Sequence, residues 1–108
     1  MKYLETIKDL PGKEMFPGYT GRFIHTGTMT FAFWEVKAGS RVPEHAHVHE
    51  QVAQIMEGKF ELTVDGNVLL LEPGKTAVIP SNVKHSGIAI TDCVLLDVFS
   101  PVREDYRI

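Results

Sequence analysis

The sequence predicts an all-β protein that folds as a sandwich or barrel of short strands. Apolar and polar residues alternate with a period of two from Thr28 to Val36 and again from Phe60 to Asp65, which is typical of strands with two distinct faces. Glycine and proline are spaced between short segments along the chain, as expected where turns separate strands. No window of about 12 residues shows helical periodicity; the best candidate is a turn near Glu5 to Leu10.

The expected strands follow one another in a simple order. After the strand at 28–36, residues 59–71 are predicted to form a hairpin about Asp65-Gly66-Asn67, because Gly66 can adopt a positive φ at little steric cost. Later strands are expected at Thr76–Ile79, His85–Ile90 and Cys93–Phe99, separated by segments rich in proline, glycine and asparagine. Such a succession favours a sandwich or barrel over a mixed α/β fold.

The length and composition predict one domain. The chain has 108 residues, of which 44% are hydrophobic, enough for one core but not for a separate catalytic domain. We divide it into an N-terminal arm with a first strand at 1–27 and a β-barrel at 28–108. Any active site should then lie inside the barrel or at a subunit interface.

The charge pattern indicates which classes of partner the protein can bind. The formal net charge is −3 and lysine and arginine do not cluster, which argues against binding to nucleic acid or to anionic membranes. The longest apolar runs are far shorter than the roughly 20 residues that span a bilayer, and the first residues lack the apolar stretch of a secretory signal. We therefore expect a cytoplasmic protein with a small-molecule ligand or a protein partner. The single cysteine, Cys93, is expected to be a buried, inert thiol.

Histidines mark a candidate metal site. His45, His47 and His49 occupy alternate positions and His85 follows about forty residues later. Alternation within a strand would place His45 and His47 on the same side, and neutral imidazole is a common ligand of transition metals. The alternative is a solvated strand face that binds nickel incidentally. Gln51 would lie about 20 Å from His45 along a straight strand, so the two can share an ion only if the chain turns between them.

Two ordered motifs resemble those of the cupins. Gly39-x5-His45-x-His47-x3-Gln51-x6-Gly58 resembles the first cupin motif, with Gln51 where the family usually has Glu. Gly74-x5-Pro80-x-Asn82-x2-His85 resembles the second, with Asn82 in place of the usual Gly and Ala89 in place of the usual Asn. The resemblance implies a cupin-type double-stranded β-helix, or jelly-roll barrel. It also implies that one divalent transition metal ion is held by His45, His47, Gln51 and His85, with His49 outside the ligand set.

The ligand set bears on the chemistry of the site. Three imidazoles and an amide leave the +2 charge of the ion uncompensated, whereas Glu would reduce it to +1. An uncompensated ion is a stronger Lewis acid and a better anchor for an anion, so we expect a carboxylate-bearing or enolisable substrate. The identity of the metal stays open among Zn, Ni, Mn and Fe.

The C-terminal segment adds three candidate catalytic residues. Asp97, Phe99 and Arg103 would line one face of the last strand and its continuation, opposite Leu96 and Val98. One interpretation is an Asp97–Arg103 salt bridge that closes the end of the barrel. The other makes Asp97 a general base and Arg103 the bidentate anchor of a substrate carboxylate.

This segment, with the glutamine-containing metal motif, is similar to small single-domain cupins related to the pectin-degradation protein KdgF. The resemblance implies an active-site set of Asp97, Phe99 and Arg103, and ring opening and tautomerisation of 4,5-unsaturated uronates. An isomerase of this kind is the leading hypothesis. A metal-dependent dioxygenase and a non-catalytic small-ligand binding or sensing barrel are the alternatives.

The N-terminal stretch predicts a homodimer. It carries more apolar surface than a short arm needs, so it could cover the sheet edge of a partner. The residues concerned are Tyr3, Leu4, Ile7, Leu10, Met15, Phe16 and Tyr19.

Overall fold

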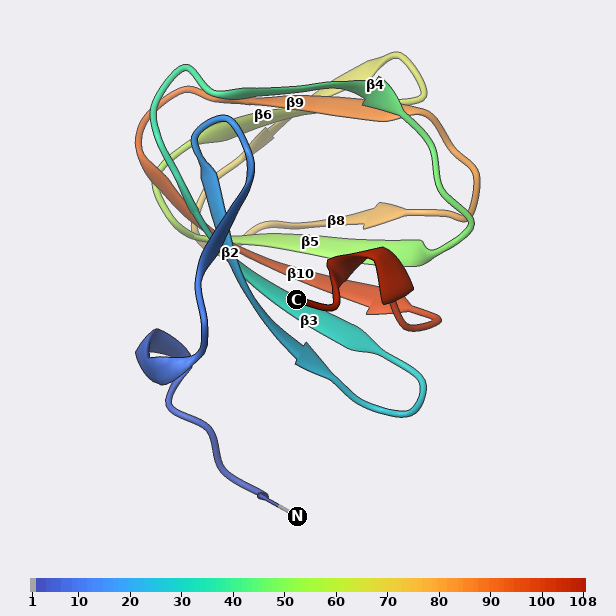
Figure 1. Ribbon diagram of the computed structural model, residues 1–108. Coiled ribbons are helices and arrows are strands. Elements are labelled where there is room, and N and C mark those ends of the chain that lie inside the picture. The colour runs from blue at the N-terminus through green and yellow to red at the C-terminus, as the bar shows by residue number, and fades with distance from the viewer. Residues whose placement is uncertain (1) are drawn as a thin grey trace.

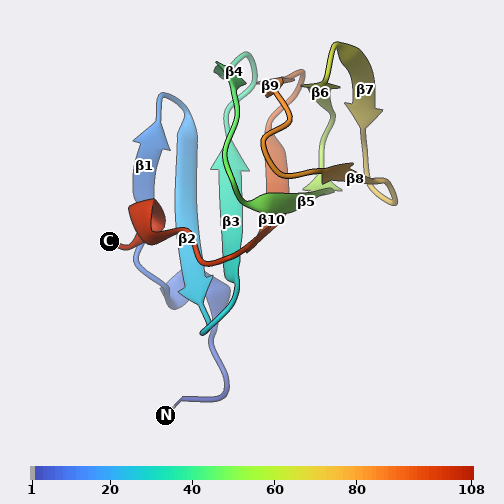
Figure 2. The same ribbon diagram turned by 90° about the vertical axis from the view of Figure 1, so that its right-hand side faces the viewer.

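Ten strands form two antiparallel sheets that face each other in the computed structural model, which describes residues 2–108 (Figures 1 and 2). The six-stranded large sheet has the order β1-β2-β3-β10-β5-β8. Its strands are β1 (Lys13–Phe16), β2 (Tyr19–His25), β3 (Thr30–Val36), β10 (Cys93–Ser100), β5 (Glu50–Glu57) and β8 (Thr76–Ile79). The four-stranded small sheet has the order β4-β9-β6-β7. Its strands are β4 (Arg41–His45), β9 (His85–Ala89), β6 (Phe60–Val64) and β7 (Asn67–Leu71). The predicted all-β jelly-roll barrel is confirmed.

In the part of the chain that the structure describes, helical structure is limited to two single turns. The 3₁₀ turns η1 (Ile7–Asp9) and η2 (Glu104–Tyr106) contain three residues each, and η1 falls within the turn expected at Glu5 to Leu10. Within residues 2–108 no helix is long and apolar enough to cross a membrane.

The strand predictions agree with the structure to within two residues. β8 has the predicted bounds, β9 ends one residue earlier than expected and β10 extends one residue further. β3 starts at Thr30 rather than Thr28, because the preceding residues form a turn. In that turn the Thr26 hydroxyl accepts a hydrogen bond from the Met29 amide at 2.9 Å, and the Thr26 amide donates to the Met29 carbonyl at 2.8 Å.

The β6–β7 hairpin has the backbone that its sequence predicts. Asp65 and Gly66 have φ angles of 49° and 78°, the left-handed conformation at both central positions that a type I′ turn requires. Asn82, which stands where the second cupin motif usually has glycine, also has a positive φ of 65°. Asparagine tolerates this region better than most residues, so the substitution preserves the turn before β9.

The core fills the space between the sheets and takes in part of the N-terminal stretch. β2 pairs with β3 from Tyr19↔Val36 to His25↔Thr30, and Tyr19 is buried against Trp34. Met15 and Phe16 also pack on the core, whereas Tyr3, Leu4 and Ile7 remain exposed. Cys93 is buried as expected. The remaining core residues are Ala32, Val36, Ala53, Ile55, Phe60, Leu62, Val64, Leu71, Ala77, Ile79, Ala89, Leu95, Phe99 and Tyr106.

Candidate functional site

Two of the candidate metal ligands form a cross-strand pair in the small sheet. His45, the last residue of β4, lies directly opposite His85, the first residue of β9, and their ring centroids are 4.2 Å apart. β4 is an edge strand and contains Pro43, which fits there because an edge strand needs fewer amide donors. The register shifts between Val42 and His45, and this irregularity sets the position from which the His45 ring enters the barrel.

His47 reaches the same place from outside the strand. β4 ends at His45, so the prediction that His45 and His47 share a face by strand alternation is wrong. The chain instead leaves the small sheet after His45 and enters β5 of the large sheet at Glu50. This turn brings the His47 ring to 4.8 Å from that of His85 and 5.7 Å from that of His45, centroid to centroid.

Hydrogen bonds to the backbone orient all three imidazoles. The Nδ1 atoms of His45, His47 and His85 each lie 2.9 Å from a backbone carbonyl oxygen two residues away. A carbonyl can only accept, so each Nδ1 carries a proton, and Nε2 is the ring atom left to bind a metal. The Nε2 atom of His85 is buried and has no hydrogen-bond partner within residues 2–108. This tautomer is the one that a metal-binding histidine needs.

The protonation state also favours metal binding. Burial, with the Arg103 charge as a smaller contribution, lowers the pKa of His47 to about 4, and burial likewise lowers the pKa of His85. Both rings are therefore neutral at pH 7, and metal ligands must be deprotonated. One ligand atom from each of His45, His47 and His85 lies within 4.8 Å of the others. The three histidines thus form a group that can hold a metal ion.

Gln51 approaches this group from the opposite sheet. It is buried in β5, and its Oε1 lies 3.1 Å from the Nε2 of His47. With the His47 proton on Nδ1, these two atoms face each other as acceptors, an arrangement that a cation between them would make favourable. The required turn between His45 and Gln51 is therefore present, and the donor set fits a divalent ion.

Asp97 points into the barrel from the middle of β10. Its neighbours across the sheet are Ala32 on β3 and Ala53 on β5, whose small side chains leave room beside the carboxyl group. Oδ2 accepts a hydrogen bond of 3.1 Å from the Trp34 indole, whereas Oδ1 is buried and has no partner among the described residues. Burial raises the pKa of Asp97 to about 6, opposed by the Gln51 amide, the Trp34 N–H and the Arg103 charge.

Arg103 does not form the salt bridge to Asp97 that we considered as one interpretation. Its Nε and Nη2 donate to the two carboxylate oxygens of Asp105 at 3.0 and 2.7 Å. The guanidinium carbon lies 4.1 Å from the ring centroid of Tyr106 and 4.7 Å from that of Phe99, and the backbone amide donates to Thr30 Oγ1 at 2.9 Å. Arg103 is therefore a buried cation held in one orientation by stacking and by a bidentate ion pair.

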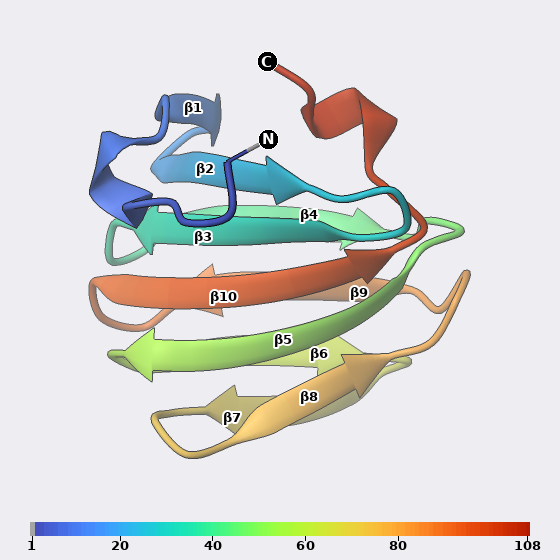
Figure 3. The same ribbon diagram turned by 90° about the horizontal axis from the view of Figure 1, so that it is seen from below.

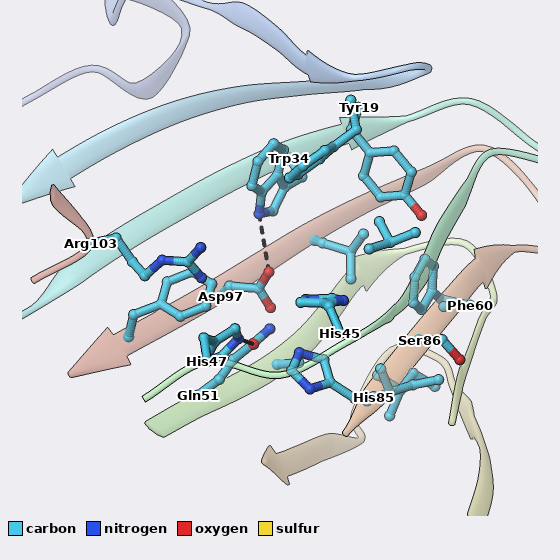
Figure 4. A pocket seen from close by; sticks show the side chains of 18 of the residues that line it. Tyr19, Trp34, His45, His47, Gln51, Phe60, His85, Ser86, Asp97 and Arg103 are labelled. Atoms are coloured by element: carbon cyan, nitrogen blue, oxygen red, sulfur yellow. Dashed lines mark hydrogen bonds between the residues drawn. The ribbon is translucent and has the colours of Figure 1, made fainter. Parts of the chain in front are cut away.

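One cavity brings these groups together (Figure 4). The close-up shows Asp97 between Trp34 and the imidazoles of His45 and His47, with the Arg103 side chain on the far side of the Asp97 carboxyl from His85. All seven predicted site residues line this cavity: His45, His47, Gln51, His85, Asp97, Phe99 and Arg103. Its deeper wall is apolar and consists of residues such as Phe16, Val42, Phe60, Leu62 and Leu71.

Comparison with known proteins identifies the family. A sequence model of the cupin domain matches residues 32–99. The chain belongs to the cupin family. The pectin degradation protein KdgF of Dickeya dadantii (strain 3937) is 30% identical over 71 residues, which are 65% of this cupin and 64% of the relative. The match therefore spans less than two thirds of that protein.

Solved cupin structures share the fold over nearly the whole chain. KdgF from Halomonas sp. superposes with a TM-score of 0.92 at 24% identity, covering 99% of this cupin and 100% of the other chain. An RmlC-like cupin from Shewanella frigidimarina NCIMB 400 gives a TM-score of 0.93 at 26% identity, with coverages of 99% and 97%. A salicylate 1,2-dioxygenase from Pseudaminobacter salicylatoxidans gives 0.74 at 26% identity, over 81% of this cupin but only 27% of that chain. These matches support a small KdgF-like cupin.

Two further residues, Trp34 and Tyr106, also line the cavity of this cupin, although the sequence did not single them out. The signal for Trp34 was present, because a tryptophan on the inner face of a strand needs an acceptor for its indole N–H. That acceptor, Asp97, is 63 residues away in the sequence, and only the β3–β10 pairing brings the two together. Tyr106 follows β10 in η2, where no strand periodicity indicates which way its ring points.

Proposed function

We propose that this cupin is a metal-dependent isomerase that opens and tautomerises an unsaturated uronate. One observation carries the proposal: Asp97 is the only carboxylate among the described residues that line the cavity, and its free Oδ1 faces the space shared with the histidine group. A single buried base beside a Lewis-acid site suits a reaction that moves one proton.

We assign His45, His47, His85 and Gln51 as the metal ligands. Their donors are three Nε2 lone pairs and one amide oxygen. Zn, Ni, Mn or Fe bound there would supply Lewis acidity with its full +2 charge, because none of the four ligands is anionic.

Asp97 is the proposed general base. A pKa of about 6 leaves the carboxylate mostly ionised at neutral pH, yet basic enough to hold a proton during the reaction. The Trp34 N–H fixes Oδ2, so Oδ1 is the oxygen that would accept and return the proton. Phe99, opposite Gln51 in the sheet, forms the apolar wall that limits water beside it.

Arg103 is the proposed anchor of the substrate carboxylate. Asp105 occupies Nε and Nη2, so a bound anion would meet the Nη1 end of the guanidinium. The stacking on Phe99 and Tyr106 holds this end in place before the anion arrives, which reduces the entropy lost on binding.

The experiment is an absorbance assay with purified protein, an added divalent ion and a 4,5-unsaturated uronate. We expect loss of the ultraviolet absorbance of the unsaturated ring without oxygen consumption. Asp97→Asn should lower the rate by about 10² to 10⁴-fold, the usual contribution of a general base. Asp65→Asn is the matched control, because Asp65 lies in the exposed β6–β7 turn. Full activity of Asp97→Asn would remove Asp97 from the mechanism.

A dioxygenase is the second candidate, favoured by the similarity to part of the salicylate 1,2-dioxygenase. It requires iron and consumes oxygen, so an oxygen electrode separates it from the isomerase. A protein that binds the uronate but changes neither absorbance nor oxygen would be the ligand-binding barrel instead. We also propose that the protein acts in the cytoplasm on a small anionic molecule.

A further inference from the structure

Thr30 carries a buried hydroxyl group beside Arg103 that the proposed mechanism does not use. It is the first residue of β3 and is 0% exposed. Its Oγ1 lies 2.9 Å from the amide nitrogen of Arg103 and 2.8 Å from Nδ1 of His25. An amide N–H can only donate, so Oγ1 accepts from Arg103 and its own proton is left for the imidazole. Valine has nearly the same shape and suits a buried strand, so the hydroxyl is the feature of Thr30 that needs an explanation.

The hydrogen bond from Arg103 attaches the C-terminal segment, residues 101–108, to the barrel. Among the hydrogen bonds within residues 2–108, it is the only one that joins this segment to the rest of the chain. The other hydrogen bonds of the segment are internal and link Arg103 with Asp105, Tyr106 with Arg103, and Arg107 with Glu104. Packing of the Tyr106 ring adds contact area, but a hydrogen bond restricts distance and angle far more closely.

Thr30 belongs to a row of the large sheet that also carries a proposed metal ligand. Cross-strand pairs join His25 to Thr30, Thr30 to Phe99 and Phe99 to Gln51. Residues in one row share a face, and the last three of these are buried, so the row faces the barrel interior. Neighbouring strands are about 4.8 Å apart, which places Gln51 about 10 Å from Thr30. Figure 3 shows β2, β3, β10 and β5 side by side, and the chain after β10 crosses the β2–β3 end of the sheet to reach η2.

This arrangement bears on a substrate that reaches from Arg103 to the metal site. The ion pair with Asp105 orients the guanidinium, but Asp105 belongs to the same segment and moves with it. The distance between the guanidinium and the metal ligands is therefore set by contacts between the segment and the barrel. An error of about 1 Å in the placement of a bound substrate can reduce the rate about 10²-fold.

We propose that Thr30 is a positioning residue for the binding of the substrate carboxylate. Its hydroxyl holds the Arg103 backbone against the row that contains Gln51, and this fixes the distance between the bound carboxylate and the metal site. Thr30 does not touch the substrate and acts through Arg103. The inference rests on the proposed function, because it assumes that Arg103 anchors a uronate.

The first test compares Thr30→Val, which removes the hydroxyl, with Thr30→Ser, which keeps it. With metal-loaded protein and a 4,5-unsaturated uronate, Thr30→Val should raise KM about tenfold and leave kcat nearly unchanged, because the anion is held less well throughout the reaction. Thr30→Ser should stay close to wild type. Thr63→Val is the matched control, since Thr63 is half-buried on the outer face of the small sheet in β6; its KM should equal that of wild type.

The second test asks whether Thr30 acts through Arg103. If it does, adding Thr30→Val to Arg103→Gln should raise KM no further, although each change alone raises it. A general loosening of the barrel would instead make the two effects multiply. Amide hydrogen exchange of the wild type needs neither a variant nor turnover. The Arg103 amide should exchange at least about tenfold more slowly than that of Glu104, which is exposed.

The proposal would be overturned by an unchanged KM in Thr30→Val, by a Thr30→Ser variant as impaired as Thr30→Val, or by effects that multiply in the double variant. If Thr30→Val does not fold, equal exchange at Arg103 and Glu104 in the wild type would overturn it. A wild type without turnover would refute the proposed function alone, and the same variants would then be compared by the Kd for galacturonate in calorimetry, with the same expected ratios. A wild type that does not bind galacturonate either would overturn both.

Discussion

The two faces of the large sheet both depart locally from the usual pattern, although most of the inner residues belong to the apolar core. Along β10 the side chain that enters the barrel at mid-strand is Asp97, whereas Leu96 and Val98 point outward beside it. A sheet with one face in water usually buries apolar residues and exposes polar ones. Here a carboxylate on the inner face lines the cavity, and apolar side chains lie beside it on the outer face. Residues that break the alternation pattern are therefore the informative ones.

The largest effect on substrate affinity is expected from Arg103→Gln. Charge-assisted hydrogen bonds contribute about 1.5 to 3 kcal/mol, so the KM for an anionic substrate should rise about 10 to 10²-fold. Steady-state kinetics would measure it. Arg107→Gln is the control, since Arg107 forms an exposed pair with Glu104. An unchanged KM in Arg103→Gln would show that this buried cation has only a structural role.

Asp97→Asn should stabilise the metal-free protein at neutral pH. Burial raises the Asp97 pKa from 3.8 to about 6. Between these two pH values Asp97 is protonated in the folded state but ionised in the unfolded state. The free energy of unfolding therefore falls as pH rises through this range. Above about pH 6 the buried Asp97 charge lowers the free energy of unfolding by about 3 kcal/mol. The neutral amide of the Asp97→Asn variant avoids this loss. Denaturant titrations in chelator should show a gain of about 2 to 3 kcal/mol at pH 7.5 and little gain at pH 4. An equal gain in the free energy of unfolding at both pH values would show that the gain does not come from the buried Asp97 charge.

Trp34→Phe should lower the stability of the protein, by less than Asp97→Asn raises it. The change leaves Oδ2 of Asp97 without its donor, and an unsatisfied buried acceptor costs about 1 to 3 kcal/mol. The free energy of unfolding should fall by about 2 kcal/mol. A double-mutant cycle with Asp97→Asn separates the part of this contact that depends on the Asp97 charge from the loss of ring volume, because the Asn carbonyl can still accept the indole N–H. If the two changes are additive, the charge of Asp97 does not strengthen this hydrogen bond.

The smallest expected effect is on the reactivity of Cys93, which lies at the far end of the inner face of β10. It is 4% exposed, and burial raises the pKa of its thiol. Alkylation with iodoacetamide at pH 8 should be at least about tenfold slower in the folded protein than after denaturation, because the thiolate is the reacting form. Equal rates would mean that this end of the barrel opens readily.

Much of the fold could be predicted from local patterns. Period-two alternation located β3 and β6, and Asp65-Gly66 located the hairpin turn, because side-chain direction and backbone φ depend on neighbouring residues. The two cupin motifs were sufficient to select the four candidate metal ligands, and the C-terminal segment supplied Asp97, Phe99 and Arg103; all seven residues line one cavity. These are properties of short segments.

The errors concern where a strand ends and which polar groups pair. His47 was placed in the strand of His45 because alternation continues past the point where the chain leaves the sheet. The partners of Asp97 and Arg103 are Trp34 and Asp105, and pairing Asp97 with Arg103 in the sequence analysis overlooked both. The choice among several possible partners depends on register and packing, which local periodicity does not specify.

The most direct test of the central claim is metal analysis by mass spectrometry on untagged protein, after reconstitution with Zn, Ni, Mn or Fe. We predict about one ion per chain in wild type and almost none in His45→Ala/His47→Ala. His49→Ala, which changes a histidine outside the proposed ligand set, should keep its ion. A wild-type protein that holds no ion after reconstitution, or a double variant that binds as much metal as wild type, would contradict the account.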